Sequence, residues 1–194
     1  MFSTNGLIPS GSDDMHKDCE RIIFTEQQLK SRIKEVAEQV DQLYKGKRPL
    51  VVGILKGSII FYADFIRHLT APVELDFMVV SSYGSGTVSS GKLKIKKDLD
   101  NDVKGRDVII VEDIIDSGFT LANLKALLLE RGASSVVIVT LLNKQERREY
   151  DIKSDFNCFD IGDEFVIGYG LDYDEQYRSL PYIAVLKASV YSGE

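Results

Sequence analysis

The sequence of 194 residues has few of the side chains that build covalent frameworks or metal centres. It contains two cysteines, two histidines, four prolines and no tryptophan. Cys19 and Cys158 lie far apart in the chain, which argues against a disulfide framework and fits a reducing compartment. His16 and His68 have neither the spacing nor the neighbours of metal ligands. Structural and catalytic roles must therefore be sought among the other polar residues.

Long apolar runs and an excess of basic charge are also missing. No apolar run reaches the length of a membrane span, and residues 1–14 have no basic segment ahead of an apolar one. We therefore expect a cytoplasmic protein without a membrane partner. With 24 basic and 30 acidic residues the net charge is −6, which argues against a nucleic-acid partner. A phosphorylated substrate remains compatible, because Mg²⁺ can bridge acidic side chains and phosphates.

Apolar periodicity predicts an α/β fold. Thr25 and Gln28 form a capping box ahead of a helix that carries Leu29, Ile33, Val36, Val40 and Leu43 on one face. Helices are also expected from residue 59 and from residue 121, the latter ending at Gly132. Predicted strands and apolar runs cover 22–24, 50–55, 73–80, 92–97, 108–111, 135–142, 156–161, 165–169 and 182–186. Strands that alternate with helices indicate a mainly parallel sheet with right-handed crossovers.

The most informative stretch is VIIVEDIIDSGFT, residues 108–120. A buried strand at 108–111 is followed by Glu112 and Asp113, and then by a turn that contains Asp116. The turn leads into a helix, whose free N–H groups and positive dipole end favour a phosphate. The sequence has neither a GxxxxGK[ST] nucleotide loop nor a DxDxDG calcium loop. A phosphate site at this turn is therefore predicted.

Polar residues follow three of the predicted parallel strands. These are Lys56-Gly57, the Glu112–Asp116 group, and Lys144. Ligands of open parallel sheets lie beyond the carboxyl ends of the strands, so we expect the three groups to share one crevice. Within residues 81–100, the glycine- and serine-rich segment 81–91 precedes an alternating Lys/Leu/Ile edge strand at 92–97. This pattern predicts a hairpin that is either a lid or an ordinary flexible hairpin.

EDIIDSGFT resembles the phosphoribosyl pyrophosphate (PRPP) motif of type I phosphoribosyltransferases, and Asp116 narrows the resemblance to the 6-oxopurine enzymes. LKG at 55–57, SSYG at 81–84 and FVIGYGLDY at 165–173 follow the same family pattern in order. The resemblance implies the type I phosphoribosyltransferase fold, a mainly parallel twisted sheet flanked by helices. It further implies a single domain, 1–194, with a small hood from about 1–24 and 156–194 and a mobile loop at about 81–100.

The activity implied by this resemblance is purine salvage. The 5-phosphoribosyl group of PRPP would be transferred to hypoxanthine or guanine, giving IMP or GMP and pyrophosphate, with Mg²⁺ as cofactor and a homodimer or homotetramer as the assembly. Two alternatives stay open. One is a xanthine-preferring phosphoribosyltransferase, and the other is a regulatory PRPP-binding protein of the same fold.

The resemblance also implies a role for each motif residue. Asp116 would be the proton acceptor, and the Leu55–Lys56 peptide bond can be cis in the family. PRPP or pyrophosphate would contact Lys56, Gly57, Glu112, Asp113, Asp116, Ser117, Gly118, Phe119, Thr120 and Arg178. The purine would contact Lys144, Phe165, Val166 and Asp172, with Ser82 and Tyr83 in the loop. The metal ligands would be Glu112, Asp113 and Asp172.

Overall fold

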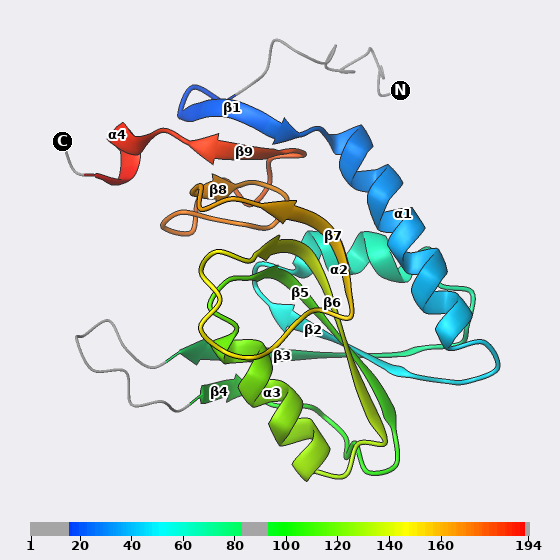
Figure 1. The fold of residues 1–194 in the computed structure, drawn as a ribbon. Helices are drawn as coiled ribbons and strands as arrows, with labels where there is room; N and C mark the ends of the chain where they lie inside the picture. Colours follow the sequence, from blue (N-terminus) through cyan, green and yellow to red (C-terminus); the bar gives the residue numbers. More distant parts are fainter. Residues whose placement is uncertain (1–15, 83–92, 193–194) are drawn as a thin grey trace, which may run out of the picture.

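The computed structural model describes residues 16–82 and 93–192, and a six-stranded sheet forms its centre (Figure 1). The strand order is β4-β3-β2-β5-β6-β7, and every pair is parallel except β3 with β4. The strands are β2 (Leu50–Leu55), β3 (Glu74–Ser82), β4 (Leu93–Lys97), β5 (Asp107–Ile115), β6 (Ser135–Lys144) and β7 (Phe156–Ile161). The predicted mainly parallel sheet is confirmed.

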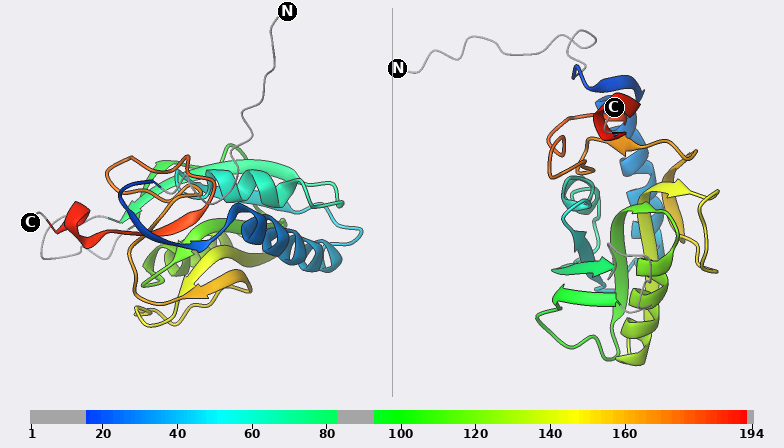
Figure 2. Two further views of the ribbon diagram at one scale, coloured as in Figure 1. Left: turned by 90° about the horizontal axis from the view of Figure 1, so that it is seen from above. Right: turned by 90° about the vertical axis from the view of Figure 1, so that its left-hand side faces the viewer.

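Helices cover both faces of this sheet, as the two further views show (Figure 2). Helices α1 (Glu26–Leu43) and α2 (Ile59–Ile66) pack on one face, and α3 (Phe119–Glu130) packs on the other. Successive residues of the central strands alternate between these layers, so that Ile109 faces α1 and α2 while Ile110 faces α3. Burial on both faces explains why the strands are continuous apolar runs in the sequence.

Helix α1 begins as the capping box predicts. The Thr25 hydroxyl accepts a hydrogen bond from the Gln28 N–H, and the Gln28 side chain accepts one from the Thr25 N–H at 2.9 Å. Four of the five apolar residues assigned to its inner face are buried, namely Leu29, Ile33, Val36 and Val40. Leu43 is 51% exposed, so its assignment to that face was wrong. It lies in the last turn, past the part of the helix that buries its apolar stripe.

Strand β5 is longer than expected. The sequence predicted a strand over 108–111 with Glu112 and Asp113 in the following loop, whereas β5 extends to Ile115. Its neighbour β6 extends to Lys144 and continues the ladder, with Glu112 opposite Thr140 and Ile115 opposite Asn143. Because the backbone groups of β5 keep their partners, the strand continues through the two acids.

One N-terminal and two C-terminal strands form a second, smaller sheet with the order β1-β9-β8, which we call the hood. Its strands are β1 (Cys19–Phe24), β8 (Val166–Ile167) and β9 (Ile183–Leu186), with the short helix α4 (Ala188–Tyr191) after β9. Figure 1 shows it above the carboxyl ends of the parallel strands. Strand β7 was assigned to the hood, but it pairs with β6 in the main sheet. The C-terminal strands of the hood therefore start with β8, later in the chain than residue 156.

Several expectations concern parts that the structure leaves out. Tyr83 and the predicted loop segment 83–92 lie outside the described residues, as does segment 1–15 of the hood expectation. Cys19 and Cys158 are buried and free, as predicted. Among the described helices, none combines the length and the apolar composition that a membrane crossing requires.

Candidate active site

The three strands that carry the predicted polar groups end at one edge of the main sheet, although Lys56, Gly57 and Lys144 do not line the pocket found there. Strands β2, β5 and β6 are neighbours and parallel, so their carboxyl ends lie side by side. A pocket of about 230 Å³ opens at the end of β5 and is lined by residues 112–121. These are the residues of the PRPP-like motif and the first turn of α3. The fold therefore turns a continuous motif into a concave site.

The turn before α3 presents free backbone donors. Gly118 is the N-cap of α3 and has a φ of 87°, a left-handed conformation that favours glycine. It supplies no side-chain cap, so the first N–H groups of the helix stay open to a ligand. No hydrogen bond from the N–H groups of Asp116, Ser117 or Gly118 is seen within the described part of the chain, whereas Phe119 N–H donates to Ser117 Oγ at 3.3 Å. This arrangement suits a phosphate.

Glu112 and Asp113 place two acids in the wall of the pocket. Burial raises the pKa of Glu112 well above its usual range, and the neighbouring charge of Asp113 adds to this effect. Burial likewise raises the pKa of Asp113, whose Oδ1 accepts a hydrogen bond from the Ile114 N–H at 2.8 Å. Glu112 Oε2 is buried and has no hydrogen-bond partner in the described structure. Such a carboxylate is stabilised by a cation or a hydroxyl group.

These acids fit a magnesium ion that is shared with a substrate. Within residues 16–82 and 93–192, no three acidic, histidine or cysteine side chains are grouped closely enough to hold a metal by themselves. Glu112, Asp113 and Asp172 accordingly do not form a cage. Mg²⁺ usually keeps several waters and is held by one or two carboxylates together with substrate phosphates. The unpartnered oxygen of Glu112 agrees with that mode of binding.

The buried charge of Glu112 predicts a dependence of stability on pH. Because its pKa is raised in the folded chain, the stability it contributes is lost as the pH rises from the ordinary carboxyl pKa through the raised value. We expect Glu112→Gln, without metal or substrate, to melt about 2–6 °C above the parent at about pH 8. At about pH 5 the gain should vanish. Glu146→Gln, at an exposed position, serves as the control. The prediction would be contradicted if Glu112→Gln and the parent melted at the same temperature at both pH values.

The turn at Gly57, which follows β2, lies against Asp113 of β5. The Leu55–Lys56 peptide bond is cis, which the family resemblance allowed. A Cβ atom placed on Gly57 would lie 1.6 Å from Asp113 Oδ2, and one placed on Gly170 would lie 2.0 Å from the Gly57 carbonyl oxygen. The turn at Gly57 is thus enclosed between Asp113 and a loop of the hood. Only glycine fits at position 170, where the close atom is backbone, whereas a Cβ atom at position 57 would require the Asp113 side chain to move.

Asp116 lines the pocket and is in contact with two arginines that the sequence analysis missed. Its Oδ1 is buried without a partner in the described structure, and its Oδ2 lies 3.6 Å from Arg147 Nη1. The neighbouring Arg148 donates to the carbonyl oxygens of Asp116 and Ile115, at 2.9 and 3.3 Å. Arg148 therefore fixes the backbone of the turn. The only sequence cue for either arginine is its position just after Lys144.

Lys144 is buried at the end of β6, with 6% of its surface exposed. Its Nζ lies 3.9 Å from Asp163 Oδ1, which also lies 3.4 Å from Arg147 Nε. Through these two residues Lys144 is connected to Asp116. A buried ammonium with a distant partner is uncommon for a structural lysine and suits recognition of a ligand oxygen.

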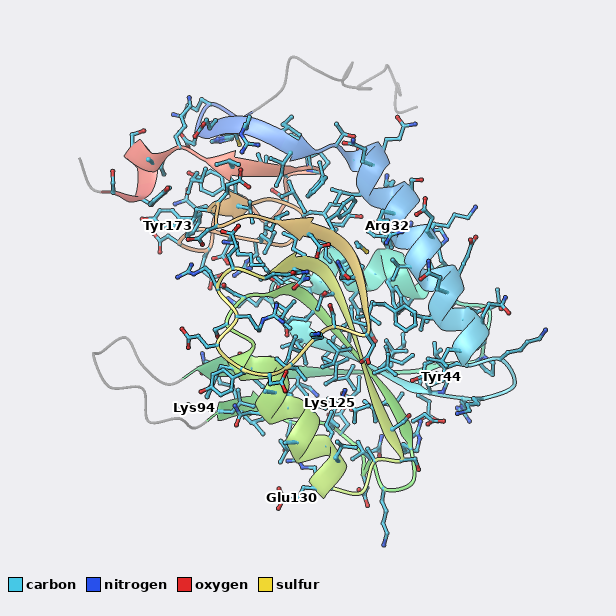
Figure 3. The ribbon with its side chains drawn as sticks, in the orientation of Figure 1. Arg32, Tyr44, Lys94, Lys125, Glu130 and Tyr173 are labelled. Carbon is cyan, nitrogen blue, oxygen red and sulfur yellow. The ribbon has the colours of Figure 1, made fainter. Side chains whose placement is uncertain are left out.

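The hood contributes an aromatic surface. Phe165 is 39% exposed, stacks on Tyr191 of α4 at 5.1 Å between centroids, and meets Tyr173 edge-on at 5.6 Å. Tyr173 lies on the same side of the molecule as α4 (Figure 3). Val166 belongs to β8, the edge strand of the hood. Its backbone consequently has β9 on one side and, among the described residues, no further strand on the other.

Arg178 and Asp172 form an ion pair over the Lys56 turn. Arg178 Nη2 lies 2.9 Å from Asp172 Oδ1, and Arg178 Nη1 donates to the Gly170 carbonyl oxygen at 2.8 Å. Glu175, which the sequence analysis did not single out, contacts both Arg178 and Lys56. The predicted phosphate-binding residues are therefore close neighbours. Of the predicted loop residues, Ser82 ends β3 and Tyr83 is not described.

Comparison with known proteins agrees with this geometry. A family model described as phosphoribosyl transferase domain matches residues 21–174. The hypoxanthine-guanine phosphoribosyltransferase of Bacillus subtilis (strain 168) is 51% identical over 179 residues, covering 92% of this chain and 99% of that protein. That of Streptococcus thermophilus (strain CNRZ 1066) is 50% identical over 178 residues, with the same coverage.

A solved structure shows the same fold. The crystal structure of a hypoxanthine phosphoribosyltransferase from Staphylococcus aureus matches with a TM-score of 0.88 and 46% identity, over 91% of this chain and 96% of that one. Sequence, fold and pocket agree across nearly the whole length. The chain therefore belongs to the hypoxanthine-guanine phosphoribosyltransferases, within the phosphoribosyl transferase domain family.

Proposed function

We propose that this protein transfers the 5-phosphoribosyl group of PRPP to hypoxanthine or guanine, with release of pyrophosphate. The observation that carries the proposal is the pocket of residues 112–121, which combines free backbone donors with buried carboxylates. The turn from Asp116 to Thr120 binds the 5′-phosphate. Glu112 and Asp113 face the ribose hydroxyls, and Lys56, Gly57 and Arg178 bind the pyrophosphate.

The reaction breaks the bond between the anomeric carbon and pyrophosphate and forms a bond from that carbon to a purine nitrogen. The proposed reaction needs no covalent intermediate with the protein, so catalysis depends on positioning and electrostatics. Asp116 accepts the proton that the other imidazole-ring nitrogen of the purine sheds. Asp116 lines the pocket, and its backbone is held by Arg148. Arg148 is thus a positioning residue, whereas Asp116 contacts the reacting base.

Mg²⁺, held by Glu112, Asp113 and Asp172 together with substrate oxygens, would neutralise charge on the pyrophosphate.

Two free, buried cysteines support a cytoplasmic setting. The proposed assembly is a homodimer or homotetramer. Ile59 and Ile60, adjacent on α2 and 39% and 37% exposed, support a contact between copies. Light scattering of the purified protein measures its size.

Lys144 determines the class of purine in this proposal. An ammonium donates three hydrogen bonds and accepts none, so it pairs with a 6-oxo group and is mismatched with a 6-amino group. Phe165 stacks on the base, and the Val166 backbone meets its edge. The purine is therefore bound between the end of β6 and the hood.

Replacing Lys144 should change both rate and selectivity. We expect Lys144→Gln to lower kcat/KM for hypoxanthine about 10–100-fold, because the 6-oxo group loses a charged donor. The preference for hypoxanthine over adenine should narrow, since a glutamine amide can accept as well as donate. Initial rates with each base measure both effects. Lys153→Gln, at an exposed position, is the matched control. Unchanged selectivity in Lys144→Gln would remove Lys144 from the purine site.

One assay tests the proposed function directly. The protein is incubated with PRPP, Mg²⁺ and one of hypoxanthine, guanine, xanthine or adenine, and nucleotide formation is followed by absorbance. We expect IMP and GMP, and no AMP. Product with xanthine alone would indicate the xanthine-preferring alternative. PRPP binding without any product would indicate the regulatory one.

A further inference from the structure

One carboxylate bridges the two cations of the proposed pyrophosphate subsite. Glu175 Oε1 and Oε2 lie 3.1 and 3.0 Å from Lys56 Nζ, and Oε2 also lies 3.2 Å from Arg178 Nη2. Lys56 follows β2, whereas Arg178 and Glu175 come from the loop between β8 and β9. The contact therefore closes one edge of the subsite with a negative charge of the chain itself.

The backbone around Glu175 fixes the start of its side chain. Tyr173 and Gln176 exchange backbone hydrogen bonds across a tight turn, and Glu175 has a φ of 61° within it. The Glu175 N–H donates to Asp172 Oδ2 at 2.9 Å. The side chain beyond this anchor is 63% exposed. Its carboxylate can therefore leave the cations by rotation, without movement of the turn.

No step of the proposed reaction uses Glu175. Its partners, Lys56 and Arg178, are the groups assigned to the pyrophosphate. Both side chains bind phosphate oxygens as readily as carboxylate oxygens. Lys56 and Arg178 lower the pKa of Glu175, so its carboxylate is ionised near neutral pH. A diphosphate that enters this subsite must compete with it.

We propose that Glu175 is an internal counter-anion that occupies the pyrophosphate subsite of the free protein and is displaced when the diphosphate of PRPP binds. The proposal rests on the proposed function, which assigns Lys56 and Arg178 to the pyrophosphate. Displacement lowers the affinity for PRPP and, equally, for pyrophosphate. Return of the carboxylate then favours release of the product. Glu175 tunes diphosphate affinity and is distinct from the residues that act on the base.

Glu175→Gln tests this by removing the charge at nearly constant size. We expect the dissociation constants of Mg²⁺-PRPP and of pyrophosphate, measured by isothermal titration calorimetry, to fall by about two- to five-fold, because exposed ion pairs contribute little each. Asp174→Asn is the matched control. It removes the same charge one residue away, from an exposed side chain with no ion pair in the described part of the chain. Its dissociation constants should equal those of the parent.

Three results would overturn the inference. Equal or weaker binding by Glu175→Gln would make Glu175 a spectator, or a residue that positions Lys56 and Arg178. Tightening to the same degree in Asp174→Asn would assign the effect to net charge alone. Arg178→Gln separates these outcomes from failure of the subsite itself. It should weaken pyrophosphate binding, and unchanged binding there would withdraw Arg178 from the subsite and the inference with it.

Discussion

Asp116→Asn is expected to lower kcat by about 10²–10⁴-fold, the usual contribution of general base catalysis. The amide keeps the shape of the carboxylate and cannot take the purine proton. Affinity for PRPP should change little, because the phosphate is bound by backbone groups of the turn, which Arg148 continues to hold through the Asp116 carbonyl oxygen. Single-turnover rates and PRPP titrations separate the two quantities.

The matched control for Asp116→Asn is Asp151→Asn, an exposed acid that follows the same arginine-bearing loop. It should retain the parental rate. An Asp116→Asn variant with full activity would exclude Asp116 as the proton acceptor. A loss of PRPP affinity equal to the loss of kcat would instead show that the side chain helps to shape the phosphate site.

Gly57→Ala is expected to abolish most of the activity, with kcat/KM for PRPP reduced by about 10²-fold or more, since small displacements of a positioned substrate cost that much. The added methyl group would meet Asp113 Oδ2 at 1.6 Å, so the Asp113 carboxylate or the Gly57 turn must shift. Gly170 packs closely on the Gly57 carbonyl group, which limits movement of the turn. We also expect a loss of stability of about 1–3 kcal/mol from overpacking.

Gly162→Ala provides the control for this substitution. A Cβ atom on Gly162 would meet its nearest neighbour, Glu164 Oε2, at 3.9 Å, and the residue has no left-handed φ. Both activity and melting temperature should remain at the parental level. If Gly57→Ala kept its affinity for PRPP, the close contact between the β2 turn and Asp113 would have no role in substrate binding.

The sheet and the helices could be predicted from the sequence because they depend on local sequence patterns. Alternating apolar runs gave the parallel sheet, and the Thr25–Gln28 pair gave the start of α1. The position of the pocket followed from one continuous motif at the end of β5. The full length of β5 could not be predicted from the sequence, because Glu112 and Asp113 carry charged side chains, which are ordinarily absent from a buried strand. Pairing with β6 overrides that local preference.

Contacts between distant segments were beyond the sequence analysis. Arg147 and Arg148 belong to a polar, mostly charged run, QERRE, that is typical of a solvated loop. Only the fold brings Arg148 onto the carbonyl oxygens of the phosphate turn. Glu175 is likewise one acid among many until the loop brings it to Lys56. Charge alone does not indicate which partner a side chain will meet.

The hood joins the earliest described strand to the latest. Cys19 pairs with Leu186 and Phe24 with Ile183, so β1 has no partner until nearly all of the chain has left the ribosome. Closing so long a loop costs entropy before it gains contacts, and we expect the hood to assemble last. A growing chain would thus acquire its sugar-phosphate half before the half that carries Phe165 and Arg178. Until the hood has formed, an incompletely synthesised chain would therefore be unable to consume PRPP.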